Sequence, residues 1–468
     1  MQQPEHALTL PARMVRIAIV APRARLREAL VAIADSGTVE LAGTLSAANG
    51  EAVESLRRLE RQGRNGSRGP VLAPDSPLVA ELEQLGAVDR LRGEVELERR
   101  SATAVEHGSF AALAGWTPEA GLAELSERLA GLGAAVIELP RPRWVEPPTL
   151  IARKPVARAF RPLVETYGPA RYADLDPTLF AAFSFALMFG MMFGDLGHGL
   201  LLAAFALALR FVRHGRLVAL RRLWPVPFAA GLSAALFGLA YGEFFGPTGV
   251  IPTLWLDPID DAPALLAAAV AVGAFLLAQS YVFGTVNRWR EEGPAAALVA
   301  PSGVAGTCIF LGGGVAAAGW YFHSGALEIA GCVIAAAGLA LLAIGFAAHA
   351  GRGGLAVVEV SVELVDAVVR VGASALSFTR LAAFGLMHAA LSAMVWAAAS
   401  ALWGGAMGAL LAVLVFLAGN VVAFSLELLV AGVQALRLEY FELFSRIFAG
   451  EGHAFSPWHI PLATKEES

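Results

Sequence analysis

The feature that most constrains this chain is a series of long apolar segments that fills its second part. Eight of them lie at about residues 177–194, 196–212, 224–245, 263–286, 296–321, 326–348, 368–403 and 406–446. A helix needs about 20 apolar residues to cross a membrane. The first two segments are shorter and are joined at residues 194–199, so one broken pair is the alternative to two full spans. The sequence therefore predicts a mostly α-helical, polytopic membrane domain over residues 173–468, ending in two long helices.

The composition of the 468 residues excludes several other classes of protein. Only 16% are charged and 56% are hydrophobic, whereas about 25% of the residues of a soluble domain are charged. A net charge of −5 excludes a broad basic surface for nucleic acid. Cys308 and Cys332 lie inside apolar runs, so no disulfide framework is predicted. Neither lysine, Lys154 or Lys465, follows a glycine. A phosphate-binding GxxxxGK[ST] loop is thus absent, and we expect no nucleotide chemistry and no cofactor in this chain.

Residues 1–172 are typical of a small cytoplasmic α/β domain. The apolar patch near residue 17 is too short for the core of a signal peptide, so the N-terminus is expected to stay in the cytoplasm. Two strand–helix–strand patterns occur in it, at residues 14–20, 23–34 and 39–41, and at residues 110–116, 118–132 and 135–139. They predict one domain whose halves are separated in the sequence.

A helical hairpin arm is predicted between these halves, at about residues 52–105. Its helices cover residues 52–61 and 76–100. The second carries apolar residues three or four apart: Leu78, Leu82, Leu85, Val88 and Leu91. Such a stripe favours another helix as its partner. The alternative is a helical insertion without a partner.

The charges of the loops predict the orientation. The loop after the second apolar segment is basic, with Arg210, Arg213, Arg216, Arg221 and Arg222. The loop after the third is acidic, with Asp257, Asp260 and Asp261. Because basic loops stay in the cytoplasm, eight crossings place both termini there.

Two arginines lie within the last two apolar segments. A charged side chain at the centre of a bilayer costs about 2.5–3.5 kcal/mol on insertion scales, so such residues are functional candidates. Arg380 has no acid within one helical turn, and Arg437 lies closer to the cytoplasmic end. The alternative for each is a structural arginine that reaches the interface or pairs with a neighbour.

Further polar residues flank these arginines. Glu363 and Asp366 precede Arg380 on the cytoplasmic side, and His388 follows it by eight residues. Glu427 precedes Arg437 by ten residues. This arrangement predicts two separate aqueous half-paths that lead to a buried arginine. A simple hydrogen bond between helices is the alternative for His388.

The sequence FGMMFGDLGHGL at residues 189–200 contains a pair of polar residues in an apolar run. Asp195 and His198 are three residues apart, but two ligands do not make a metal site. We therefore predict no metal, and expect the glycines to break the helix and Asp195 to cap the next one.

These residues resemble those of a known family. FGMMFGDLGHG resembles the FxxMFGDxGHG signature of the large membrane subunit of rotary V-type ATPases, called subunit a or subunit I. Its matching positions are Gly194, Asp195, Gly197 and His198. Residues 115–118 (GWTP), 147–149 (PPT), 241–246 (YGEFFG), 377–392 (SFTRLAAFGLMHAALS), 436–438 (LRL) and 448–452 (FAGEG) also resemble that family.

The resemblance implies a stator subunit without catalytic activity of its own. The two long, tilted last helices would face a rotating ring of proteolipid subunits, each with an ion-binding carboxylate. Arg380 would match the essential arginine and Arg437 the second one. Asp366, Glu363, His388, Glu427 and Glu442 would lie along the half-channels for a proton or sodium ion. Further implied partners are peripheral stalk subunits, the catalytic ATPase sector and the lipid of a bacterial or archaeal plasma membrane.

Some features depart from the family. The first 172 residues are shorter than is usual in it, and Glu439 stands where an uncharged or aromatic residue is common. Counted from a turn at residues 404–405, Arg380 and Arg437 differ in height by about 12 Å on straight helices. Strong tilt, or a kink near Gly419 or Gly432, would bring them level. The alternative function is a stand-alone secondary transporter or channel, which would have broken helices in both halves.

Overall fold

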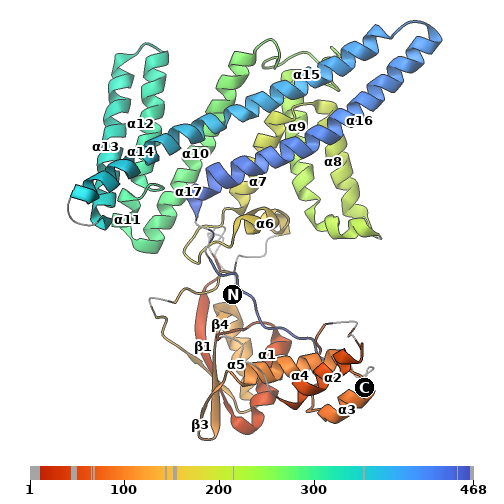
Figure 1. Cartoon of the computed structure of the whole chain (residues 1–468), viewed down its shortest axis with the longest axis vertical. Coiled ribbons are helices and arrows are strands. Elements are labelled where there is room, and N and C mark those ends of the chain that lie inside the picture. The colour runs from red at the N-terminus through yellow and green to blue at the C-terminus, as the bar shows by residue number, and fades with distance from the viewer. Residues whose placement is uncertain are drawn as a thin grey trace. The chain divides into compact units, whose positions relative to one another are not determined.

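The computed structural model (Figure 1) describes residues 11–43, 50–64, 66, 69–142, 145–150, 155–213, 215–350, 354–448, 450 and 452–463. The chain divides into two compact units. One takes in Arg153–Glu451, and the other combines Leu10–Ala152 with Gly452–Ser468. We call them the membrane unit and the α/β unit.

The membrane unit is helical, as the sequence predicts. Its helices are α6 (Pro155–Tyr167), α7 (Thr178–Met192), α8 (Leu196–Phe211), η3 (Arg216–Leu223), α9 (Pro225–Tyr241), α10 (Ala262–Glu292), α11 (Pro294–Val299), α12 (Val304–Tyr321), α13 (Gly325–His349), α14 (Gly354–Ser377), α15 (Thr379–Ala401), α16 (Gly405–Leu438), η4 (Glu439–Phe444) and α17 (Ser445–Ile447). In the described part of the chain, five helical stretches are long and apolar enough to cross a membrane. Three shorter apolar helices, α7, α8 and α9, precede them.

Glycines let the short helices pack closely. A Cβ atom on Gly199 of α8 would lie 2.4 Å from the backbone nitrogen of Ala235 on α9. A Cβ atom on Gly231 of α9 would lie 2.7 Å from the backbone nitrogen of Ala203 on α8. Small residues at facing positions are the usual basis of helix association in lipid, so α8 and α9 form a tight pair.

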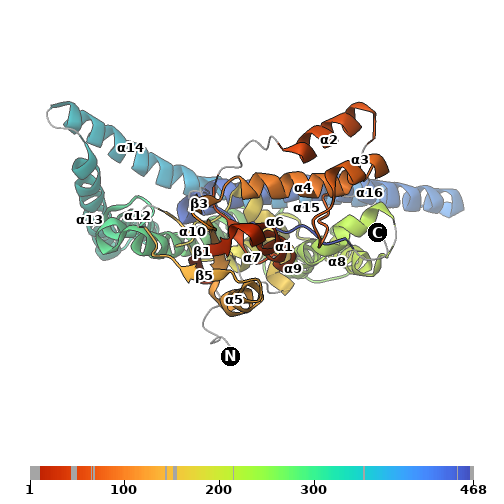
Figure 2. The same ribbon diagram turned by 90° about the horizontal axis from the view of Figure 1, so that it is seen from below.

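The last long helices run obliquely beside one another, which confirms the two tilted helices of the predicted fold. Figures 1 and 2 show α15 alongside α16, with α14 continuing the line of α15. Helix α16 is continuous through Gly419 and Gly432. The interruptions lie elsewhere, at Phe378 between α14 and α15 and at η4, a π-helix that follows α16 directly.

One antiparallel sheet organises the α/β unit. Its strands are β1 (Met14–Pro22), β2 (Glu40–Leu41), β3 (Val105–His107), β4 (Phe110–Pro118) and β5 (Ala135–Glu138). The order is β2-β4-β1-β5, with β3 paired to β4. Strand β1 pairs with β4 from Met14↔Pro118 to Pro22↔Phe110. The two predicted strand–helix–strand halves therefore interleave in one sheet, an arrangement of the split βαβ kind.

Two helices cover this sheet. They are α1 (Leu26–Ser36), entered through the 3-10 turn η1 (Arg23–Arg25), and α5 (Leu122–Ala130), entered through η2 (Glu119–Gly121). Ile17 and Ile19 of β1 pack with Leu30 of α1 and Leu129 of α5 in the buried core. The sequence predicts both helices but misses β3, whose three residues are all exposed.

The arm is made of α2 (Glu51–Arg61), α3 (Val79–Leu85) and α4 (Val88–Ser101). The predicted single helix over residues 76–100 is therefore wrong, because Gly86 adopts a left-handed conformation (φ 65°) that ends α3. Leu82, Val88 and Leu91 are buried in a small cluster with Leu59 of α2. Part of the predicted apolar stripe is therefore buried by α2 of the same chain.

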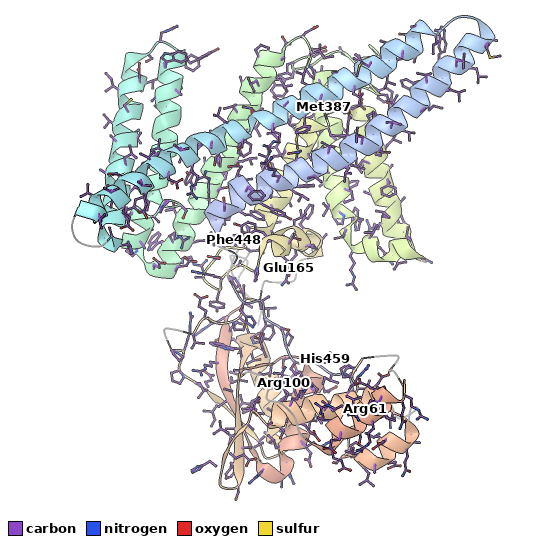
Figure 3. The ribbon with its side chains drawn as sticks, viewed as in Figure 1. Arg61, Arg100, Glu165, Met387, Phe448 and His459 are labelled. Atoms are coloured by element: carbon purple, nitrogen blue, oxygen red, sulfur yellow. The ribbon has the colours of Figure 1, made fainter. Side chains whose placement is uncertain are left out.

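The tail of the chain belongs to the α/β unit. The Trp458 backbone nitrogen donates to the Val39 carbonyl oxygen at 2.8 Å, and the Leu72 nitrogen donates to the Pro461 oxygen at 3.0 Å. The Arg100 guanidinium lies over the Trp458 ring at 5.7 Å, and Figure 3 marks Arg100 and the nearby His459. Residues 452–463 thus close one side of the core.

Candidate functional site: a buried cluster, two arginines and a cavity

The break between α7 and α8 is held by Asp195, which is fully buried. Its Oδ1 accepts a hydrogen bond from the His198 backbone nitrogen at 2.8 Å, and its Oδ2 accepts one from the Gly246 nitrogen at 2.9 Å. A carboxylate at this position satisfies free N–H groups of the first helical turn. The predicted cap of α8 is therefore confirmed. The same carboxylate also fixes the loop after α9.

Four more polar residues meet Asp195 inside the membrane unit. They are His198 of α8, Glu243 just after α9, His388 of α15 and Glu427 of α16, and each is at most 5% exposed. We call these five residues the buried cluster. His388 Nδ1 contacts Glu427 Oε2 directly. His388 Nε2 lies 3.9 Å from Glu243 Oε2, and His198 Nδ1 lies 3.6 Å from Asp195 Oδ1.

Aromatic rings surround the two histidines. Phe193 lies 5.1 Å from His388 and 5.9 Å from His198, measured between ring centroids. Phe245 and Phe424 lie 5.1 Å and 5.6 Å from His198. Apolar walls lower the local dielectric and strengthen each interaction within the cluster. For the same reason, buried charges here need partners.

Glu243 is the residue of this cluster that is not among the predicted site residues. It lies in the YGEFFG segment, after Gly242 ends α9 in a left-handed conformation. It lies outside a helix and before an acidic loop, as a residue of an interfacial loop would. The available signal was a lone acid between an apolar helix and two phenylalanines.

Arg380 lies at the start of α15, and Arg437 lies at the end of α16. Arg380 is half-buried and Arg437 is exposed. Arg437 and Glu442 are the charged residues that act electrostatically on Arg380. Within the described part of the chain, neither arginine makes a hydrogen bond or an ion pair. The chain therefore brings the two predicted arginines into one region and leaves both guanidinium groups without a carboxylate partner.

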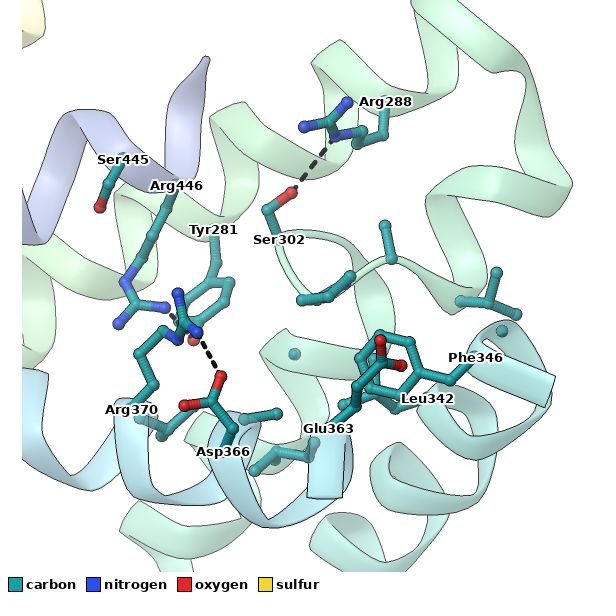
Figure 4. Close-up of a pocket in the computed structure, with 18 of the residues that line it drawn as sticks. Tyr281, Arg288, Ser302, Leu342, Phe346, Glu363, Asp366, Arg370, Ser445 and Arg446 are labelled. Carbon is teal, nitrogen blue, oxygen red and sulfur yellow. Dashed lines mark hydrogen bonds and ion pairs between the residues drawn. The ribbon is translucent and has the colours of Figure 1, made fainter. Parts of the chain in front are cut away.

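A cavity of about 880 Å³ lies between residues of α10, α14 and η4, and several charged side chains line it (Figure 4). The predicted residues Glu363, Asp366 and Glu442 line it. Arg370 pairs with Asp366 one turn away on α14. The cavity is thus lined by acids from α14 and from η4.

Arg446 of α17 also lines this cavity and was not predicted. Its guanidinium donates to the Tyr281 hydroxyl and to Ser374 Oγ, both at 2.6 Å, and it stacks over the Tyr281 ring at 4.9 Å. The sequence offers little signal for it, because it is the final residue of the last apolar segment, and arginines are common where such segments end.

The π-helix η4 places a further acid in the core. Glu439 is fully buried, and the Ser184 hydroxyl of α7 lies 2.8 Å from each of its carboxyl oxygens. A π-helix changes the direction of the side chains that follow, and such turns are frequent at functional sites. The acid that departs from the family pattern therefore faces α7, two residues from Arg437.

A second buried acid lies before α7, outside the membrane-spanning helices. Asp174 is 1% exposed, and its Oδ2 accepts a hydrogen bond from the Arg171 nitrogen at 2.9 Å. Burial, reinforced by the nearby Glu291, raises the pKa of Asp174 to about 7. Next to it, the Leu175 nitrogen donates to Asn287 Oδ1 of α10 at 2.9 Å, which ties this lead-in to the helix bundle.

The described fold defines a multi-pass membrane protein that carries a buried charged cluster between its helices. Residues 103–219 match the model of the V-type ATPase 116kDa subunit family. The chain is 28% identical over 362 residues to the A-type ATP synthase subunit I of Pyrococcus abyssi, which covers 74% of this chain and 53% of the relative. It is 30% identical over 374 residues to the A-type ATP synthase subunit I of Halobacterium salinarum, covering 67% and 51%. A bacterial relative, the V-type ATP synthase subunit I 2 of Treponema pallidum, is 31% identical over 216 residues, covering 43% and 44%.

The chain belongs to the subunit I family of A-type and V-type ATPases. It spans about half the length of the curated relatives that it matches.

Proposed function

We propose that this chain is the membrane stator subunit of a rotary ATPase, and that it passes protons or sodium ions to and from the carboxylates of a proteolipid ring. Arg380 is the residue that meets the empty, ionised ring carboxylate. Arg437 supports it from the neighbouring helix.

The observation that carries this proposal is the unpaired guanidinium of Arg380. It is half-buried on an apolar helix, and its charged neighbours are another arginine and Glu442. An unpaired charge in a membrane is costly, so a carboxylate from another subunit is the expected partner. A bidentate arginine–carboxylate pair is a strong and directional interaction.

The order of the polar residues along both helices supports two half-paths. His388 follows Arg380 by eight residues, about 12 Å along α15, and Glu427 precedes Arg437 by ten, about 15 Å along α16. The buried cluster therefore lies on one side of the arginines. Glu363, Asp366 and Glu442 line the cavity on the other side. We assign the cluster to the outer half-path and the cavity to the inner one.

The arginines would separate these half-paths. A guanidinium keeps its proton at any working pH, so Arg380 cannot relay protons between the cluster and the cavity. An ionised ring carboxylate is stabilised while it passes Arg380. After it accepts an ion from one half-path it is neutral, and it can leave into lipid at much lower cost.

The charges of the loops favour an orientation with both termini in the cytoplasm of a bacterial or archaeal cell. The basic residues after α8 then face the cytoplasm, and Asp257, Asp260 and Asp261 face outward. In this orientation the α/β unit lies on the side of the catalytic sector.

Leu78 and Leu85 of its arm are 72% and 69% exposed. We assign them to contact with a peripheral stalk helix, which would keep the subunit from turning with the ring.

Ion uptake by the reconstituted complex tests the proposal. Arg380→Ala should abolish ATP-driven ion uptake into vesicles while the complex still assembles. Arg213→Ala, which removes an exposed arginine of the loop after α8, is the matched control and should leave uptake unchanged. Full uptake by an assembled Arg380→Ala complex would refute the proposal.

The alternative of a stand-alone transporter is less well supported. The helix interruption at Phe378 gives the second half a break, as such a transporter would have. However, the unpaired Arg380 lies on the exposed helix pair rather than in an enclosed substrate site. Ion flux through vesicles that contain this chain alone would favour the alternative.

A further inference from the structure

Part of the buried cluster has the composition of a metal site. Asp195, His198 and His388 each offer one ligand atom, and these atoms lie within 4.8 Å of one another. A fourth group, Glu243 Oε2, lies 3.9 Å from His388 Nε2. The sequence places only Asp195 and His198 together, and the fold adds the other two from α15 and from the end of α9.

The ligand atoms of this set are largely unused. Among the described residues, no hydrogen-bond partner exists for either ring nitrogen of His198, for His388 Nε2 or for Glu243 Oε2. The Asn420 side chain interacts with the His198 ring, but without the geometry of a hydrogen bond. His198 is 1% exposed and His388 is 2% exposed. Buried polar atoms are nearly always satisfied, so unsatisfied ones that converge on one point indicate a missing partner.

His388 is also oriented as a metal ligand usually is. Its Nδ1 contacts the Glu427 carboxylate, which leaves Nε2 free to face Glu243 Oε2, 3.9 Å away. Metal-bound histidines typically donate the second ring N–H to a carboxylate, which fixes the tautomer and makes the ligand more basic. Glu427 fills that role here without being a ligand itself.

We propose that Asp195, His198, His388 and Glu243 bind one divalent transition-metal ion, with Zn²⁺ as the best match. Two imidazoles and two carboxylates suit Zn²⁺ and its neighbours better than Mg²⁺ or Ca²⁺, which prefer oxygen ligands alone. The two carboxylates balance the charge of the ion, as a site in a low-dielectric interior requires. Four ligands about 2.0–2.1 Å from Zn²⁺ lie about 3.4 Å apart, so the ligand atoms of Asp195, His198 and His388, now within 4.8 Å of one another, close by up to about 1.4 Å, and Glu243 moves in with them.

An occupied site would have a functional consequence that rests on the proposed function. If the buried cluster is the outer half-path, Zn²⁺ would take the free nitrogens and carboxylate oxygens that receive the passing ion. The metal would therefore inhibit translocation, and binding and inhibition are separate measurements.

Binding is measured on the purified full chain in detergent. After equilibration with Zn²⁺ and dialysis, the native chain should retain one Zn²⁺ per chain. The amount retained should be at least tenfold lower in His198→Gln and in His388→Gln. His323→Asn is the matched control, because His323 is exposed and has a positive φ of 54° that asparagine tolerates. It should retain the metal. A native chain without Zn²⁺, or a folded His198→Gln chain that retains it, would overturn the inference.

A second measurement needs no variant. X-ray absorption at the zinc edge of the native chain should show two imidazole and two oxygen ligands in four coordination. Sulfur ligands, or six oxygen ligands, would place the metal elsewhere and would contradict the inference.

Ion uptake by the reconstituted complex then separates the two proposals. Zn²⁺ should inhibit ion uptake by the His323→Asn complex as it does in the native complex, because the proposed metal site is intact in both. Loss of this inhibition in His323→Asn would contradict the assigned site. Zn²⁺ bound at the site without inhibition would support the metal site and contradict the assignment of the cluster to the outer half-path.

Discussion

His388 of α15 and Glu427 of α16 join the two long helices by direct contact of imidazole Nδ1 with carboxylate Oε2, although 39 residues separate them in the sequence. Both side chains are 3% exposed. Elsewhere the facing surfaces of these helices are mostly apolar. The pair therefore fixes how α15 and α16 are aligned along their length, and it does so at the level of the buried cluster.

This alignment predicts strong coupling between the two residues. His388→Leu or Glu427→Leu alone should lower the stability of the membrane unit by about 3–5 kcal/mol, because each leaves the other group buried without its partner. The double variant should recover a large part of that loss. The measurement is the unfolding midpoint of the purified chain in detergent, analysed as a double-mutant cycle. Ser425→Ala on the exposed face of α16 is the control, and strictly additive losses would contradict the coupling.

Much of the fold could be predicted from sequence because the responsible forces are local. Long apolar runs predict the membrane helices, and alternating residues predict the sheet of the α/β unit. The interruption at Phe378 could not be predicted in this way. Its ring occupies the space beside Gly273 of α10, where a Cβ atom would lie 2.2 Å from it. Such a contact depends on the packing of distant helices and leaves no local pattern.

The same difference between local patterns and contacts of distant helices decides which site residues could be predicted. Arg380, Arg437, His388 and Glu427 could be found because a charge in an apolar run is conspicuous by itself. Glu243 could not, since it lies after the end of α9 and its burial depends on residues far away in the sequence, among them His388 of α15, 3.9 Å from it. Its burial at 5% exposure is a tertiary property.

The arm offers a prediction about its surface. Leu78→Ser combined with Leu85→Ser should leave the arm folded, because both side chains are mostly exposed, but should release the stalk partner from the complex. Leu82→Ala provides the contrast. Leu82 is 3% exposed in the cluster with Leu59, so its truncation should cost about 2–5 kcal/mol and loosen the arm itself. Limited proteolysis reports the folding of the arm, and co-purification reports the partner. A complex that keeps its stalk in the Leu78 and Leu85 variant would show that the arm has no partner there.

Asp174 predicts a pH dependence of stability. Its folded pKa of about 7 lies above the ordinary value of 3.8, so the folded chain binds a proton more tightly than the unfolded chain does. Stability should therefore fall as the pH rises from about 4 to 7 and stay low above that range. Asp174→Asn removes the titrating group, and it should raise the unfolding midpoint at pH 8 while changing it little at pH 4. Asp260→Asn in the exposed loop before α10 is the control. A lower midpoint for Asp174→Asn at pH 8 would mean that the ionised carboxylate is stabilising.

The two arginines should respond differently to substitution. Arg380→Lys should reduce ATP-driven ion uptake more than about tenfold, which corresponds to about 1.4 kcal/mol. Lysine keeps a charge but lacks the planar fork that holds a carboxylate through two hydrogen bonds, and its ammonium loses its proton more readily in an apolar setting. Arg437→Lys should retain most of the uptake, because Arg437 is exposed and acts on Arg380 through its charge. Uptake is measured in vesicles with assembly checked in the same preparation. Equal losses in the two lysine variants would show that both arginines hold the ring carboxylate directly.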